Sequence, residues 1–284
     1  MAKPVVFIAA GGKPVTVVES GGLPVTEVTA LGQPVTEATG AMPVTRVLAE
    51  GATSWAPSYV NNGGTAYISY DGASGVGSDS DTLEIVCAFR SLNTQPAAIS
   101  RMVHIVGGRV NLSFTATWRI SVILISTGGN LVDWTSANNA QGIFHSAGEY
   151  EFRMRASLGA TPTMEVWVRT TVDGVTGDWT TVTGSFAVGP TTGTIDCSRG
   201  GQAGNEIAIM AQTTGASIMN ADFGYLWWKA GSLQAADAFG SDGVRINPAT
   251  VSTPDLYVTG PAANLTVDAG GGKTLVLNGP FTDV

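Results

Sequence analysis

Two neighbouring carboxylates are the first candidates for chemistry in this sequence. Glu149 and Glu151 lie two residues apart in a stretch that alternates charged and apolar residues, so both point to one face of a strand. Two acids that flank one glycosidic bond, roughly 5–9 Å apart, can hydrolyse it. However, Arg153 and Arg155 share that face, and cations favour the ionised carboxylate, whereas a general acid must stay protonated. The pattern therefore favours a solvated charged surface or a subunit contact, and it predicts no catalytic residue.

Other chemistry-bearing residues give no stronger signal. His104 and His145 are the only histidines, so a zinc site of three histidines is impossible. His145 could hydrogen-bond inside a core, and no nucleophile stands out beside it in the sequence. The glycine-rich residues 199–204 lack the Lys-Ser/Thr pair and the following helix of a phosphate loop. We expect no metal and no cofactor.

Aromatic side chains are the candidates for binding. Trp227 and Trp228 are adjacent, and adjacent strand residues point to opposite faces, so both cannot lie in the core of a simple strand. One is expected at an interface with another subunit, with the N-terminal repeats or with a sugar ring. Because tryptophan is enriched at protein contacts, a protein contact is preferred. Trp167 is a further candidate for a glycan or subunit contact, and Glu165 beside it on the same strand could hold a sugar or be a solvated charge.

These residues are positioned by short strands between glycine-rich turns. Alternation of apolar and polar residues is clearest at 149–155, where Tyr150, Phe152 and Met154 form the apolar face. Helical patterning is nearly absent, which predicts an antiparallel β-sandwich over residues 81–240, after a transition segment at 51–80 and before a small β extension at 241–284. The predicted strands cover residues 83–90, 110–116, 118–125, 131–134, 149–155, 164–169, 207–211 and 223–228.

The first fifty residues repeat a short unit of a turn, a proline and residues rich in valine and threonine. The repeated prolines are Pro4, Pro14, Pro24, Pro34 and Pro43. Proline suits the first residue of a strand, and so short a strand needs partners to offset its ordering entropy. Residues 1–50 are therefore predicted to be a stalk or anchor; a flexible linker is the alternative. The predicted oligomer contacts are Val15, Val25, Val35 and Val44.

Composition excludes several classes of protein. The chain has 284 residues, a net charge of −8 and a pI near 4.7, which argues against nucleic-acid binding. The sequence contains no run of eighteen apolar residues, so it predicts no membrane-spanning helix. The first residues lack the apolar core of a secretory signal. Cys87 and Cys197 could pair, but free buried thiols are expected in a chain made in a reducing cytoplasm.

The order and spacing of the strands resemble the concanavalin A-like, laminin-G-type jelly roll over about residues 80–240. The stretches that carry this resemblance are residues 142–145, 149–152, 166–169 and 224–227. Such domains sometimes bind calcium, for which Asp79, Ser80, Asp81 and Asp222 are candidates; turn-capping aspartates are the preferred interpretation. Glycosidases on this sandwich carry a Glu-x-Asp-x-x-Glu motif, which this chain lacks.

The repeats, together with residues 256–262 and 275–279, resemble structural proteins of tailed bacteriophages and prophages of Gram-negative bacteria. This resemblance implies a virion fibre, spike or decoration protein, made in the bacterial host cytoplasm, with its location in capsid, neck or tail left open. The repeats, which cannot bury their apolar faces alone, predict a homo-oligomer, and the resemblance favours a trimer. The resemblance further implies contacts with other virion proteins through the repeats and with host-surface glycans through the sandwich. The alternative is a carbohydrate-active enzyme or lectin of the concanavalin A-like class.

Overall fold

A computed structural model describes most of the chain and divides it into two compact units. Residues 1–55 and 243–245 form the first unit, and residues 56–242 and 246–284 form the second. The described residues are 9–10, 28–30, 47–48, 55–70, 76–90, 99–105, 109–117, 119–137, 148–172, 174–198, 207–212, 215–240, 244–266, 268 and 272–284. Among them, no helix is long and apolar enough to cross a membrane.

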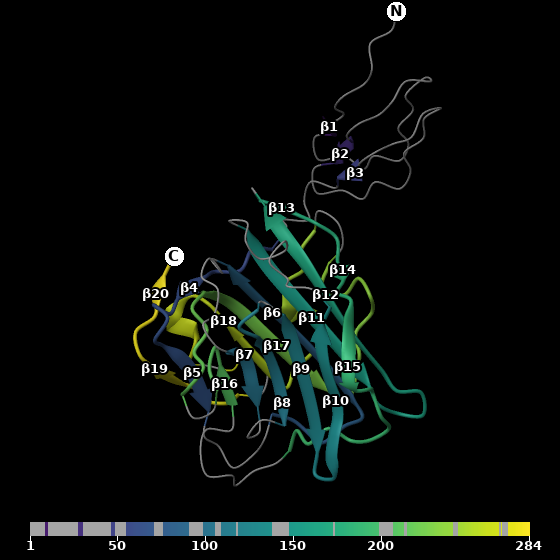
Figure 1. Cartoon of the computed structure of the whole chain (residues 1–284). Helices are drawn as coiled ribbons and strands as arrows, with labels where there is room; N and C mark the ends of the chain where they lie inside the picture. The colour runs from purple at the N-terminus through teal and green to yellow at the C-terminus, as the bar shows by residue number, and fades with distance from the viewer. Residues whose placement is uncertain are drawn as a thin grey trace, which may run out of the picture. The chain divides into compact units, whose positions relative to one another are not determined.

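Three short strands of the first unit form a parallel sheet. They are β1 (Ala9–Ala10), β2 (Val28–Ala30) and β3 (Val47–Leu48), in that order (Figure 1). Ala9 pairs with Thr29, and Val28 pairs with Val47. These pairs lie 20 and 19 residues apart (29 − 9 and 47 − 28), which equals two steps of the repeated prolines. Each described strand therefore pairs with one that is two repeats away.

The valines predicted as oligomer contacts lie outside the described residues. These valines are Val15, Val25, Val35 and Val44. Their role in assembly stays a prediction.

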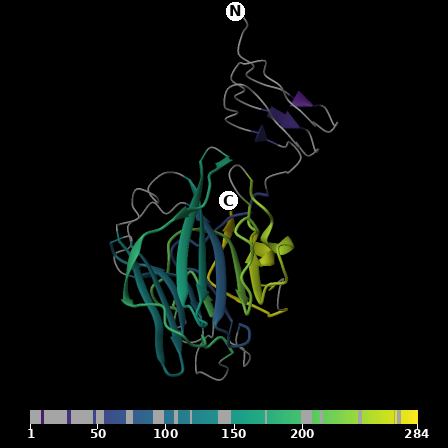
Figure 2. The same ribbon diagram turned by 90° about the vertical axis from the view of Figure 1, so that its right-hand side faces the viewer.

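The second unit is a sandwich of two antiparallel sheets (Figures 1 and 2). The eight-stranded sheet contains, in spatial order, β15 (Gly184–Val188), β10 (Gly129–Ser136), β9 (Ile120–Ser126), β8 (Val110–Phe114), β7 (Ser100–Ile105), β16 (Ile207–Ile209), β5 (Tyr67–Tyr70) and β19 (Val276–Asn278).

The nine-stranded sheet contains, in spatial order, β13 (Val175–Thr176), β12 (Thr163–Val172), β11 (Glu149–Ser157), β6 (Thr82–Arg90), β17 (Asp222–Ala230), β4 (Val60–Asn61) and β20 (Thr282–Asp283). In addition, β14 (Thr180–Thr181) pairs with β12, and β18 (Leu256–Thr259) pairs with β17. Two 3₁₀ turns, η2 (Pro248–Thr250) and η3 (Ala262–Asn264), lie in the C-terminal part. The segments predicted as a transition and as a C-terminal extension thus supply strands to the sandwich.

Aromatic rings fill the space between the sheets. Phe114 of one sheet packs edge-on against Phe152 of the other, with ring centroids 5.6 Å apart, and Phe89 lies between Phe152 and Phe223. All four side chains are buried. Fully burying one such ring stabilises the fold by about 1.5–3 kcal/mol, so this aromatic layer contributes to the stability of the sandwich. The antiparallel β-sandwich predicted from the sequence is confirmed.

Candidate functional site

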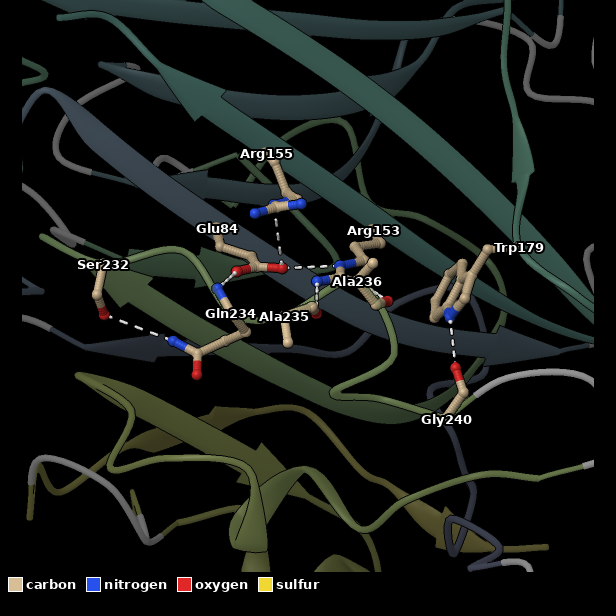
Figure 3. A network of polar contacts seen from close by, with 9 residues as sticks. All are labelled: Glu84, Arg153, Arg155, Trp179, Ser232, Gln234, Ala235, Ala236 and Gly240. Atoms are coloured by element: carbon tan, nitrogen blue, oxygen red, sulfur yellow. Dashed lines mark hydrogen bonds and ion pairs between the residues drawn. The ribbon is translucent and has the colours of Figure 1, made fainter.

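The outer faces of the two sheets are the places where a sandwich can present side chains to a partner. Along each strand, one residue points into the core and the next points outward. On the nine-stranded sheet the outward residues include charged groups, and residues 232–240, called the strap below, run across them (Figure 3). On the eight-stranded sheet they form a smaller polar cluster.

Glu84 is the centre of one half of the network under the strap (Figure 3). Arg153 Nε lies 2.7 Å from Glu84 Oε1, and both side chains are buried. The strap's Gln234 amide donates to Glu84 Oε2 at 2.6 Å. Arg153 in turn donates to the carbonyls of Ala235 and Ala236. Every polar atom named here has a partner, which is what burial of charge in a protein requires.

Glu151 is the centre of the other half. Arg169 Nε lies 2.6 Å from Glu151 Oε2, and the Tyr225 hydroxyl donates to Glu151 Oε1. Arg169 also donates to the Phe239 carbonyl of the strap at 2.8 Å. The strand register brings Glu151 and Arg169 together, because Glu151 lies directly opposite Arg169 on the neighbouring strand.

The structure corrects the expectation of a solvated face on β11. Glu151 and Arg153 were predicted to be exposed, and they are 1% and 3% exposed. The prediction is wrong because alternation shows which side of a strand a residue takes, not what covers that side. Glu149 and Arg155 are half-buried.

The tryptophans predicted as glycan or subunit contacts pack against other residues of the same chain. Trp227 and Trp228 are both fully buried: Trp228 belongs to the core between the sheets, and Trp227 packs edge-on against the strap's Phe239 at 5.0 Å. Trp167 is half-buried beside the guanidinium groups of Arg153 and Arg155. Trp227 therefore contacts the strap of its own chain.

Two of the predicted calcium candidates, Asp79 and Asp222, have other partners. Asp79 Oδ1 accepts hydrogen bonds from the Cys197 and Ser198 amides, both at 2.7 Å. Burial opposes ionisation of Asp79, but these hydrogen bonds hold its pKa below the usual value. Asp222 pairs with Arg90 at 3.0 Å and accepts from Asn61 at 2.6 Å. Among the described residues, no group of three or more acidic, histidine or cysteine side chains could hold a metal ion.

Cys87 and Cys197 are free and buried, as expected, and burial raises the pKa of both thiols. Glu165 is exposed at the surface. His145 and the glycine-rich residues 199–204 lie outside the described part of the chain.

A polar cluster lies on the outer face of the eight-stranded sheet, where β7 and β8 pair. It consists of Arg101, His104, Asn111 and Ser113, called the Arg101 quartet below. Arg101 is opposite Ser113, and His104 is opposite Asn111. A register shift after Arg101 places Arg101 and His104, which are three residues apart, on one face. His104, Asn111 and Ser113 are 6%, 4% and 1% exposed.

Two polar atoms of the quartet have no hydrogen-bond partner: Arg101 Nε and Asn111 Oδ1. The only hydrogen bond described for the Arg101 guanidinium is a long one, 3.5 Å from Nη1 to Ser113 Oγ. Burial lowers the Arg101 pKa, and burial together with the Arg101 charge lowers the pKa of His104 to about 4. His104 is therefore neutral near pH 7, and Arg101 carries the only charge of the quartet.

Two residues with strained backbone conformations are hydrogen-bonded to β7, the strand that carries Arg101 and His104. Among the described residues, Met210 and Ser217 are the only non-glycine residues with positive φ, at 68° and 55°. The Arg101 amide donates to the Ser217 carbonyl at 3.0 Å, and the Met210 amide donates to the Met102 carbonyl at 2.8 Å. Such conformations cost roughly 1–3 kcal/mol each and gather at ligand sites.

Only part of the quartet could have been found from the sequence. Outward placement of Asn111 and Ser113 follows from the inward alternation of Val110, Leu112 and Phe114. Arg101 has no such signal, because its placement depends on a register shift that no periodicity reports.

Comparisons with known proteins give distant likenesses. No protein-family model and no curated protein sequence matches the chain. Among solved structures, domains LG4-5 of the mouse laminin alpha1 chain align over 66% of this chain and 45% of theirs, at 14% identity and a TM-score of 0.39. An alginate lyase, Aly36B, solved as a mutant with alginate tetrasaccharide, aligns over 60% of this chain and 82% of its own, at 11% identity and a TM-score of 0.24.

This chain spans less than half of the laminin structure. Likenesses this distant carry no argument about activity. The class that the chain's own sheets define is an all-β, two-sheet antiparallel sandwich, accompanied by a separate unit built from repeats.

Proposed function

We propose that this chain is a structural protein of a tailed-bacteriophage virion, whose sandwich binds host-surface glycans and whose repeats anchor and oligomerise it. The Arg101 quartet is the binding site, and the protein is not an enzyme. The virion part rests on the resemblance of the repeats and the C-terminal stretches to phage structural proteins. The glycan-binding part rests on the quartet.

The observation that carries the binding role is the pair of unsatisfied polar atoms in the quartet. A buried donor or acceptor without a partner costs about 1–3 kcal/mol. Arg101 Nε and Asn111 Oδ1 are both in this state, one as a donor and the other as an acceptor. A sugar offers ring and hydroxyl oxygens to the first and hydroxyl protons to the second, so a bound glycan would satisfy both.

The acids under the strap support the proposal that the protein is not catalytic. Both oxygens of Glu151 are engaged, one by Arg169 and one by Tyr225, and Glu84 holds Arg153 and Gln234. A general acid or nucleophile needs a carboxylate that faces the substrate. Release of reducing ends from any bacterial surface polysaccharide by the full-length protein would contradict this part of the proposal.

Glycan binding can be tested by calorimetric titration with purified polysaccharides of the host surface. Arg101→Gln and Asn111→Ala each remove one unsatisfied group, and each is expected to weaken binding at least tenfold. Arg119→Gln is the matched control, since Arg119 is an exposed arginine just before β9 of the same sheet. Binding that survives both quartet substitutions would exclude this site.

The virion assignment needs a separate measurement. Gold-labelled antibody against the sandwich is expected to mark one fixed position on the phage particle in electron micrographs. Particles without label, from lysates that contain the protein, would contradict the assignment.

A further inference from the structure

We propose that the Arg101 quartet selects acidic sugars: Arg101 donates to a sugar carboxylate, and Asn111 Oδ1 accepts from a hydroxyl of the same sugar. This inference rests on the proposed glycan-binding function and names the class of glycan.

No carboxylate of the described residues forms an ion pair with Arg101. Five other arginines form ion pairs with carboxylates: Arg90, Arg109, Arg153, Arg155 and Arg169. No ion pair between described residues contains Arg101, although it is half-buried and burial lowers its pKa. A partly buried cation is costly unless an anion accompanies it. The missing partner of Arg101 is therefore best supplied by a ligand that carries negative charge.

The free atoms of Arg101 suit a carboxylate. A guanidinium group presents parallel N–H donors whose spacing matches the two oxygens of a carboxylate. Arg101 Nε, a donor of one such pair, has no partner, and Nη1, a donor of the other pair, makes only the 3.5 Å contact with Ser113. Both donors can turn to an incoming acid without breaking an ion pair.

The remaining members of the quartet limit the ligand further. Asn111 is diagonal to Arg101 across the two strands, a spacing of about 7–8 Å between backbone positions. One sugar ring with a carboxylate at one side and a hydroxyl at the other covers such a distance. Neutral His104 adds no second positive charge, so the site matches a single negative charge better than a phosphate dianion.

The experiment compares each acidic probe with an uncharged counterpart. The full-length protein is titrated with tetragalacturonate and its methyl ester, with 3′-sialyllactose and lactose, and with galactose 6-phosphate and galactose. At least one acid is expected to bind ten times more tightly than its uncharged partner, and Arg101→Gln should remove that difference while Arg119→Gln preserves it. The protein's net charge of −8 opposes non-specific binding of acidic probes.

A second variant keeps the test decisive if Arg101→Gln is poorly folded. Asn111→Asp preserves shape but adds a negative charge at the site, so it should abolish binding of the acids and spare their uncharged partners. Thermal unfolding checks that each variant is folded.

The outcomes separate this inference from the proposed function. Equal binding of acidic and uncharged partners, lost in Arg101→Gln, would overturn the acid preference and leave glycan binding intact. Tighter binding of the phosphate than of either carboxylate would overturn the choice of acid. Failure of every probe, together with failure of purified host polysaccharides, would overturn both.

Discussion

Glu151 and Arg169 are a fully buried ion pair, and such pairs matter most when one member is lost. Replacing one partner leaves an uncompensated buried charge, whereas the intact pair contributes little net stability. We predict that Glu151→Gln lowers the free energy of unfolding by about 3–5 kcal/mol, because the buried Arg169 charge then loses its carboxylate partner.

Chemical denaturation measures this effect. Glu165→Gln makes the same change at an exposed position of the next strand and should shift stability by less than about 0.5 kcal/mol. A loss in Glu151→Gln no larger than that of the control would contradict the role assigned to the pair.

His104 makes the stability of the sandwich depend on pH. Its pKa in the folded chain is about 4, below its ordinary value of 6.5, so the unfolded chain binds the proton more readily. Stability is therefore expected to fall as the pH drops from 6.5 towards 4, in addition to any loss from the carboxylates.

The His104→Gln variant isolates this contribution, since it keeps a polar side chain and cannot titrate. Its unfolding free energy should decline less between pH 6.5 and 4.5 than that of the unmodified protein. Identical slopes would mean that His104 does not control this range.

Besides its hydrogen bonds, the strap contacts the nine-stranded sheet through one large apolar side chain. Phe239 is fully buried and lies edge-on against Trp227. Phe239→Ala should lower stability by about 3–5 kcal/mol and expose Trp227 to water. A red shift of the tryptophan emission and a lower denaturation midpoint would be measured together.

Phe186→Ala serves as the control, because this phenylalanine is 43% exposed on β15. If Phe239→Ala leaves both the emission and the midpoint unchanged, the strap is not anchored as described.

The strands and their inward faces could be predicted from the sequence, but the strap that covers the nine-stranded sheet could not. The apolar positions of β11 predicted its inward face, because alternation is a property of each strand alone. The strap has no periodicity, and its contacts with Arg153 and Arg169 join residues 70 to 83 positions apart. The Arg101 quartet depends on a register shift in β7, which is likewise a property of a strand pair.

The assembly of the complete protein is predicted from the repeats. The described strands β1, β2 and β3 have two or three residues each, too few to be stable in isolation. We predict a homo-oligomer, with a trimer preferred from the resemblance to phage structural proteins. Light scattering should then give about three times the chain mass of 29.1 kDa.

Replacing Val15, Val25, Val35 and Val44 together by serine should dissociate this oligomer and leave the sandwich folded. A monomeric full-length protein at micromolar concentration would contradict the prediction. An oligomer that survives the four substitutions would place the contact elsewhere.

The contacts between the strap and the sheet determine which strap residues can be replaced. Arg153, Arg169 and Trp179 bind the strap through the carbonyls of Ala235, Ala236, Phe239 and Gly240, groups that every amino acid possesses. The side chains of Ala235, Ala236 and Asp237 point to solvent, and they are exposed. An antibody epitope or a labelling tag could therefore replace these three residues while Phe239 stays in place, which makes the strap a convenient position for labelling the protein.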